Sequence, residues 1–152
     1  SMNKWEREGK LKAVITQNID GLHQKAGSRE VLELHGSVLR NHCLRCGKFY
    51  GVEAVAESTG IPRCTCGGVI KPDVVLYEES LDEQVMEKAL DYIAGADVLI
   101  IGGTSLVVYP AAGLVRYYRG KKLVVINRDA TGMDSAARLC ISAPIGQVLG
   151  QL

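Results

Sequence analysis

The sequence lacks several features that would place it in a specialised class of protein. Its 152 residues contain no apolar run of 18 residues, so no transmembrane helix is predicted. The N-terminus lacks the charged-then-apolar layout of a signal peptide, and we therefore expect a cytoplasmic protein. Lys and Arg number 18 against 17 Asp and Glu, so no charge excess predicts binding to nucleic acid or to a membrane surface. Internal repeats and low-complexity segments are absent, and the length suits one domain with at most a small insert.

Four of the five cysteines form two closely spaced pairs. The pairs are Cys43-x2-Cys46 and, after 17 intervening residues, Cys64-x-Cys66. In a cytoplasmic protein this spacing favours a metal over disulfides, and four thiolates suit tetrahedral zinc. His42 is a competing ligand, and four reduced thiols without a metal are the alternative interpretation. Cys140 lies in an apolar run, and we expect it in the core.

Short apolar runs alternate with helical patterns along most of the chain. We expect strands at residues 12–15, 31–34, 73–77, 97–101, 123–126 and 139–141. We expect helices at residues 3–9, 20–26, 52–57 and 144–149, from a capping box that starts at Ser80, and from Pro110 to about Gly120. This alternation predicts an α/β fold, a truncated Rossmann-like parallel sheet with helices on both faces.

Residues 38–71 differ in composition from the rest, because cysteine, glycine and turn residues replace the apolar runs. A segment this short has too little apolar core to fold without its metal. The sequence therefore predicts a small zinc-binding module at 38–71, inserted into a Rossmann-like domain that comprises residues 1–37 and 72–152.

Polar side chains follow three of the expected strands. Gln17, Asn18 and Asp20 come just after the first strand, Gly102-Gly103-Thr104-Ser105 follow the strand at 97–101, and Asn127 follows the strand at 123–126. Open α/β sheets bind ligands at the carboxyl ends of their strands, and a glycine turn before a helix suits a phosphate. Taken one at a time, these residues would more often be ordinary turn or cap residues.

Together these motifs resemble the sirtuins, the NAD-dependent protein lysine deacylases. The resemblance rests on Thr16–His23 (TQNIDGLH), Glu33–Ser37 (ELHGS), Lys71–Glu79 (KPDVVLYEE) and Gly103–Pro110 (GTSLVVYP), and it runs from residue 5 to the C-terminus. It implies NAD as the cofactor, zinc as a second bound group, and an acyl-lysine protein or peptide as the substrate. It departs from the family at Tyr77 and Glu78, where many members carry phenylalanine and glycine, which puts the details of peptide pairing in doubt.

The resemblance also implies a role for individual residues. His35 matches the catalytic histidine, which removes a proton from a ribose hydroxyl after nicotinamide has left, as an imidazole can at neutral pH. The residues that match cofactor contacts are Gln17, Asn18, Ile19, Asp20, Gly103, Thr104, Ser105 and Asn127. The residues that match peptide contacts are Val74, Val75, Leu76, Tyr77, Val107 and Val108.

One family motif has no counterpart in the sequence. Sirtuins begin with a strand and a Gly-Ala-Gly-x-Ser loop, and this chain contains neither. We expect about the first third of a sirtuin to be absent, together with a central strand between the strands at 12–15 and 97–101. The isolated chain should then be inactive, and its unpaired strand edges should favour self-association. The alternative is a non-catalytic zinc-bearing binding or scaffold fragment.

Overall fold

The computed structural model describes residues 1–152 and contains five α-helices, one 3-10 helix and eight strands. The helices are α1 (Met2–Arg7), α2 (Leu22–Lys25), α3 (Glu53–Ala56), α4 (Glu83–Gly95), the 3-10 helix η1 (Ala111–Tyr117) and α5 (Ile145–Gly150). The strands are β1 (Val14–Thr16), β2 (Val31–Glu33), β3 (Gly36–Cys43), β4 (Phe49–Gly51), β5 (Ile70–Val74), β6 (Val98–Gly102), β7 (Lys122–Ile126) and β8 (Leu139–Ile141). Every expected element overlaps one of these, whereas β3 and β4 were not expected. None of the helices combines the length and the apolar character needed to span a bilayer.

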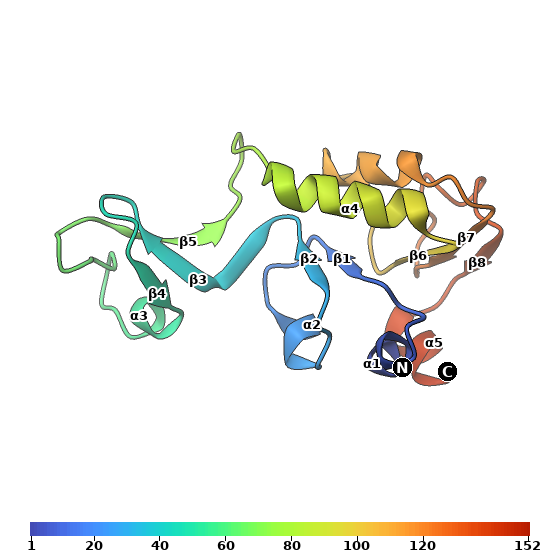
Figure 1. Ribbon diagram of the computed structural model, residues 1–152, viewed down its shortest axis with the longest axis horizontal. Helices are drawn as coiled ribbons and strands as arrows, with labels where there is room; N and C mark the ends of the chain where they lie inside the picture. Colours follow the sequence, from blue (N-terminus) through green and yellow to red (C-terminus); the bar gives the residue numbers. More distant parts are fainter.

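The strands form three separate sheets (Figure 1). β1 pairs with β2, and β6, β7 and β8 pair in sequence order; both of these sheets are parallel, as the continuous apolar runs predict. β3 is the central strand of an antiparallel sheet, between β4 and β5. β1 and β6 each have a neighbour on one side only, so the open strand edges expected from the sequence are present.

Helix α4 holds the two parallel sheets together. Its N-cap is Asp82, whose carboxylate accepts hydrogen bonds from the backbone N–H groups of Gln84 and Val85 at 2.9 and 3.1 Å. The prediction of a capping box at Ser80 is therefore wrong by two residues, because Asp82 is the residue in extended conformation whose side chain reaches the free N–H groups.

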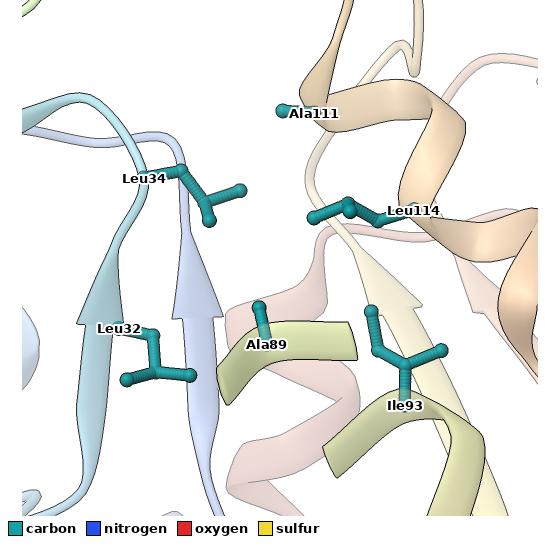
Figure 2. Close-up of a cluster of buried hydrophobic side chains, with 6 residues drawn as sticks. All are labelled: Leu32, Leu34, Ala89, Ile93, Ala111 and Leu114. Atoms are coloured by element: carbon teal, nitrogen blue, oxygen red, sulfur yellow. The ribbon is translucent and has the colours of Figure 1, made fainter. Parts of the chain in front are cut away.

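The main hydrophobic core lies between the β2 segment, α4 and η1 (Figure 2). Ala89 and Ile93 of α4 are 0% and 4% exposed and lie on one face of the helix, four residues apart. They pack against residues of the β2 segment and of η1: Leu32, Leu34, Ala111 and Leu114. Burying a side chain the size of Ile93 contributes about 1.5–3 kcal/mol. Leu99 of β6 also packs against this cluster, which therefore connects the β1–β2 sheet to the β6–β8 sheet.

The β6–β8 sheet has one well-covered face. Ile101, Leu123 and Val125 are buried on that face, and α5 approaches the opposite face, where Ile145 lies against Gly102. Helices therefore lie on both faces, although Val98 remains 46% exposed. Cys140 is also exposed, and the prediction of a core cysteine is wrong, because β8 is the edge strand of this sheet.

The metal-binding module forms one end of the elongated molecule (Figure 1). β3 runs from Gly36 to Cys43 and β5 from Ile70 to Val74, so both strands cross the domain bounds proposed from the sequence. The strand expected at 73–77 is displaced, since β5 begins three residues earlier and ends at Val74. Its position is set by antiparallel pairing with β3, a non-local contact that the apolar pattern does not report.

Candidate active site and metal centre

The loop that follows β1 positions His35. The Thr16 carbonyl accepts a hydrogen bond from the Leu34 N–H at 2.9 Å, which brings residue 17 beside residue 35. His35 Nδ1 then lies 3.1 Å from the Gln17 carbonyl oxygen. Because a carbonyl oxygen only accepts, Nδ1 carries the hydrogen, and Nε2 of the neutral ring retains its lone pair. The main chain thus orients His35 to accept a proton through Nε2.

The Gln17 side chain links this loop to the loop after β6. Its Nε2 donates to the Val108 carbonyl oxygen, and its Oε1 accepts from the Thr104 hydroxyl, each at 3.4 Å. The Gly103 N–H donates to the Ile126 carbonyl oxygen at 3.1 Å, which joins the end of β6 to the end of β7. The carboxyl ends of β1, β6 and β7 therefore converge, as expected for parallel strands around a ligand site.

The side chains of two other predicted cofactor residues make local contacts. The Asn127 side chain donates to the Asp129 carbonyl oxygen at 2.9 Å. The Asp20 carboxylate accepts from the Leu22 N–H at 3.0 Å, at the start of α2. The remaining members lie in the same two loops: Asn18, Ile19 and Ser105. Four of these eight residues join one strand end to another: Gln17, Gly103, Thr104 and also Asn127, whose backbone N–H donates to the Ile141 carbonyl oxygen at 3.1 Å.

The predicted peptide-binding segments lie on either side of this edge. Val74 closes β5, and the Val75 N–H donates to the His35 carbonyl oxygen at 3.1 Å. Val107 and Val108 are 70% and 51% exposed in the loop before η1. Both segments therefore reach the region of His35, with apolar side chains open to solvent.

The chain turns sharply after Val75 instead of continuing as a strand. The Leu76 N–H and the Lys71 ammonium both donate to the Glu79 carboxylate, at 2.9 and 3.2 Å, and these hydrogen bonds lower the pKa of Glu79. Tyr77 projects fully into solvent. Glu78 has φ of +70°, a conformation that favours glycine. The departure from the sirtuin pattern therefore places a side chain in a conformation that costs about 1–2 kcal/mol.

The four paired cysteines come together as the sequence predicts. Their sulfur atoms all lie within 4.8 Å of one another, with Cys43 to Cys66 at 3.5 Å and Cys46 to Cys64 at 3.6 Å. A zinc ion with Zn–S bonds of about 2.3 Å requires sulfur separations of about 3.8 Å in a tetrahedron. Cys43 and Cys64 are buried and Cys46 is exposed. The residues present therefore fit zinc.

Hydrogen bonds favour the thiolate form of Cys64. The Cys66 N–H and the Tyr50 hydroxyl donate to its sulfur at 3.5 and 3.0 Å, and they lower the pKa of Cys64 to about 5. Cys66 shifts in the opposite direction: the Gly68 N–H favours its thiolate, but hydrogen bonds to Cys43 and Cys64, together with burial, raise its pKa to about 11. Cys64 therefore carries negative charge more readily than Cys66, and zinc would displace the thiol protons because a metal ion deprotonates a coordinating thiol.

Sequence reasoning missed two residues that support this cluster. Arg45 donates its backbone N–H to the Cys43 sulfur at 3.4 Å and its guanidinium to the Cys66 carbonyl oxygen at 2.8 Å, which links the two cysteine pairs. Tyr50 was missed as well. The available signals were weak: Arg45 lies inside the first pair, and Tyr50 lies four residues after Cys46.

A third missed feature is an ion-pair network between the module and the β1–β2 sheet. Arg40 of β3 contacts the Glu33 carboxylate of β2 at 2.7 Å and the Asp73 carboxylate of β5 at 3.1 Å. The Glu33 side chain is only 6% exposed. An isolated buried carboxylate is unfavourable, so the Arg40 guanidinium neutralises the negative charge of Glu33 between β2 and β3.

Comparison with known proteins identifies the family. The Sir2 family model matches residues 1–110. The chain belongs to the Sir2 family. The NAD-dependent protein deacetylase of Clostridium perfringens is 62% identical over 154 residues, which cover 100% of this chain and 63% of that protein. The NAD-dependent protein deacetylase of Staphylococcus aureus strain Mu50 is 47% identical and covers 98% of this chain and 61% of its own length. This Sir2-family chain thus spans about three fifths of the curated relatives it matches.

Solved structures of Sir2 proteins have the same fold. A complex described as Sir2 with a p53 peptide and NAD+ superposes with a TM-score of 0.89 at 41% identity, over 97% of this chain and 64% of that one. A structure of Sir2Tm bound to a propionylated peptide gives a TM-score of 0.90 at 40% identity, over 97% and 65%. The Rossmann-like fold with its cysteine cluster, expected from the sequence, is confirmed.

Proposed function

We propose that this chain carries the catalytic histidine, one side of the NAD site and the zinc module of an NAD-dependent protein lysine deacylase. The observation that carries the proposal is the hydrogen bond of 3.1 Å between His35 Nδ1 and the Gln17 carbonyl oxygen. It leaves Nε2 as a proton acceptor at the edge where β1, β6 and β7 end. The proposal is also supported by relatives named NAD-dependent protein deacetylases and by solved Sir2 complexes with NAD+ and peptide.

In this proposal His35 acts as a general base. NAD, when bound, supplies the ribose carbon that accepts the acyl group's oxygen as nicotinamide leaves. His35 Nε2 then accepts the proton that a ribose hydroxyl must lose. The Gln17 carbonyl holds the ring in the required tautomer throughout, so the base does not depend on a neighbouring acid for its orientation.

The remaining site residues bind and orient the cofactor and the peptide in this proposal. The proposed cofactor contacts are Gln17, Asn18, Ile19, Asp20, Gly103, Thr104, Ser105 and Asn127. The proposed peptide contacts are Val74, Val75, Leu76, Tyr77, Val107 and Val108. Gln17 makes its two 3.4 Å contacts within the protein, so it must exchange them for cofactor contacts when the site fills.

The four cysteines would hold zinc as a structural ion, because all four positions of the tetrahedron are taken by protein ligands. We propose a zinc module at 38–71 and a Rossmann-like unit at 1–37 and 72–152, with β3 and β5 crossing the two bounds. We also propose a cytoplasmic location, since four zinc-binding thiolates require a reducing compartment.

A non-catalytic scaffold is the second candidate. One observation favours it: β1 and β6 do not pair with each other, and each has one unpaired edge. In this alternative the chain binds partners through these edges and the zinc module.

The test mixes the chain with the part of the Clostridium perfringens deacetylase that the alignment leaves uncovered, and adds NAD and an acetylated peptide. Release of nicotinamide together with loss of the acetyl group supports the deacylase. His35→Ala should abolish turnover and leave NAD binding largely intact, because a base acts on a transition state rather than on ground-state binding. His23→Ala is the matched control and should remain active. Turnover that persists in His35→Ala would refute the assignment, and a mixture that binds but never turns over would favour the scaffold.

A further inference from the structure

Tyr50 occupies an unusual position beside the cysteine cluster. It lies in β4, pairs with Asn41 of β3, and packs against the buried group formed by Cys43, Cys64 and Ile70. Its hydroxyl donates to the Cys64 sulfur at 3.0 Å. The O–H group therefore forms a hydrogen bond with one of the four candidate zinc ligands.

The surroundings of Tyr50 strengthen this contact. The Lys48 ammonium lies 5.3 Å from the centre of the Tyr50 ring. A cation over an aromatic face withdraws electron density, which makes the phenolic O–H a better donor. Its acceptor is the Cys64 sulfur, which is a thiolate when it binds metal, so the hydrogen bond is charge-assisted.

Cys64 also belongs to the pair that most needs support. The Cys64-x-Cys66 pair has one residue fewer between its cysteines than Cys43-x2-Cys46, so its chain has less freedom to aim both sulfurs at one ion. A hydroxyl from β4 fixes the first sulfur of this short pair from outside the loop. Partners of metal ligands commonly contribute 10–100-fold in metal affinity.

We propose that Tyr50 is a positioning residue of the zinc centre, whose hydroxyl holds the Cys64 thiolate in place and lowers the energy of its sulfur electrons. The inference rests on the zinc site of the proposed function, and it goes beyond that site by naming the group that tunes it. Because a thiolate fixed by this hydrogen bond is harder to protonate and to displace, zinc should leave the cluster more slowly than it would with four thiolates alone.

The experiment replaces the hydroxyl and keeps the ring. Tyr50→Phe retains the packing against the cluster, and Tyr117→Phe, an exposed tyrosine at the end of η1, is the matched control. Each 152-residue chain is loaded with zinc, and metal transfer to an excess of a coloured chelator is timed. A second sample is loaded with cobalt(II), whose sulfur-to-metal charge-transfer band reports the energy of the sulfur electrons.

Tyr50→Phe should release zinc about 10-fold faster than the parent chain. Its charge-transfer band should move to lower energy, because a thiolate that loses a hydrogen bond holds its electrons less tightly. Acceleration below threefold, or a band that coincides with that of Tyr117→Phe, would overturn the role of Tyr50 and leave the zinc site intact. A parent chain that takes up neither zinc nor cobalt would overturn the zinc site, and the inference with it.

Discussion

Gly36, the residue after the candidate base, is the position at which a single methyl group should do most harm. Gly36 has φ of +74° and pairs with Val74 of β5. A Cβ atom built there overlaps the carbonyl group of Asp73, lying 2.9 Å from its carbon, and lies 3.3 Å from the Val74 Cα. Both neighbours are backbone, so neither can rotate away as a flexible side chain would.

The cost of Gly36→Ala has two parts. The left-handed conformation costs a residue with a Cβ about 1–2 kcal/mol. Forcing a methyl group into closely packed backbone costs about 1–3 kcal/mol more. We therefore expect Gly36→Ala to lower the free energy of unfolding by about 2–5 kcal/mol, and to shift the strand register on which His35 and Val75 depend.

Gly60→Ala separates these two parts. Gly60 lies in the zinc module at φ of +84°, and no atom lies within 4 Å of a Cβ built on it. Its alanine variant should show only the conformational cost, about 1–2 kcal/mol. Urea unfolding of both variants with saturating zinc measures the difference. Equal destabilisation by the two substitutions would refute the argument that Gly36 is required by the close approach of β5.

Four further outcomes are expected. Arg40→Met should lower the free energy of unfolding by about 1–3 kcal/mol, because it leaves the buried Glu33 carboxylate without a partner. The loss should be smaller than for a fully buried pair, because Arg40 is partly exposed. Lys10→Met breaks an equally short pair with the exposed Glu8, and should leave the free energy of unfolding unchanged in the same urea assay. Glu78→Gly should raise the melting temperature through a gain of about 0.5–1 kcal/mol, because relief of the left-handed strain exceeds the added chain entropy, and calorimetry showing destabilisation would contradict this. A chelator should expose the zinc module to protease before the rest of the chain, because metal binding there is folding free energy, and simultaneous cleavage everywhere would count against it. The isolated chain should dimerise through the open edges of β1 and β6 and bind NAD weakly, so a strictly monomeric sedimentation profile with micromolar NAD affinity by calorimetry would show the reasoning to be wrong.

The fold could be predicted where local pattern and tertiary environment agree. The apolar runs of β6 and β7 and the apolar spacing of Ala89 and Ile93 in α4 reported their burial directly. The strand β3 could not be predicted in this way. Its sequence mixes valine and leucine with Arg40, Asn41 and His42, and its register is irregular between Ser37 and Asn41. The pairing with β5, whose residues come 27 to 38 positions later in the chain, stabilises β3, and such a contact produces no periodic pattern in the sequence.

The candidate site was predictable as a set of side chains, but not as a set of contacts. The motifs pointed to His35 and Gln17, but the contact between them uses a main-chain carbonyl, which has no sequence signature. The same limit applies to Tyr50, whose partner Cys64 is 14 residues away. Charge pairing at Arg40 depends on the burial of Glu33, which follows from packing rather than from composition.

The three sheets have a consequence for how the chain folds during synthesis. The strands of each sheet come from one unbroken stretch, 14–33, 36–74 and 98–141. No stretch must wait for a later one to complete its hydrogen-bonded ladder, so each can form in turn as it leaves the ribosome. The core formed by β2, α4 and η1 depends on distant parts of the sequence, because it contains both Leu32 and Leu114, and so do the hydrogen bonds from Gln17 to Thr104 and Val108. We therefore expect the hydrogen-bonded sheets to form one after another, and the shared hydrophobic core to form last. The loops that carry His35 and Thr104 come together only in that last step.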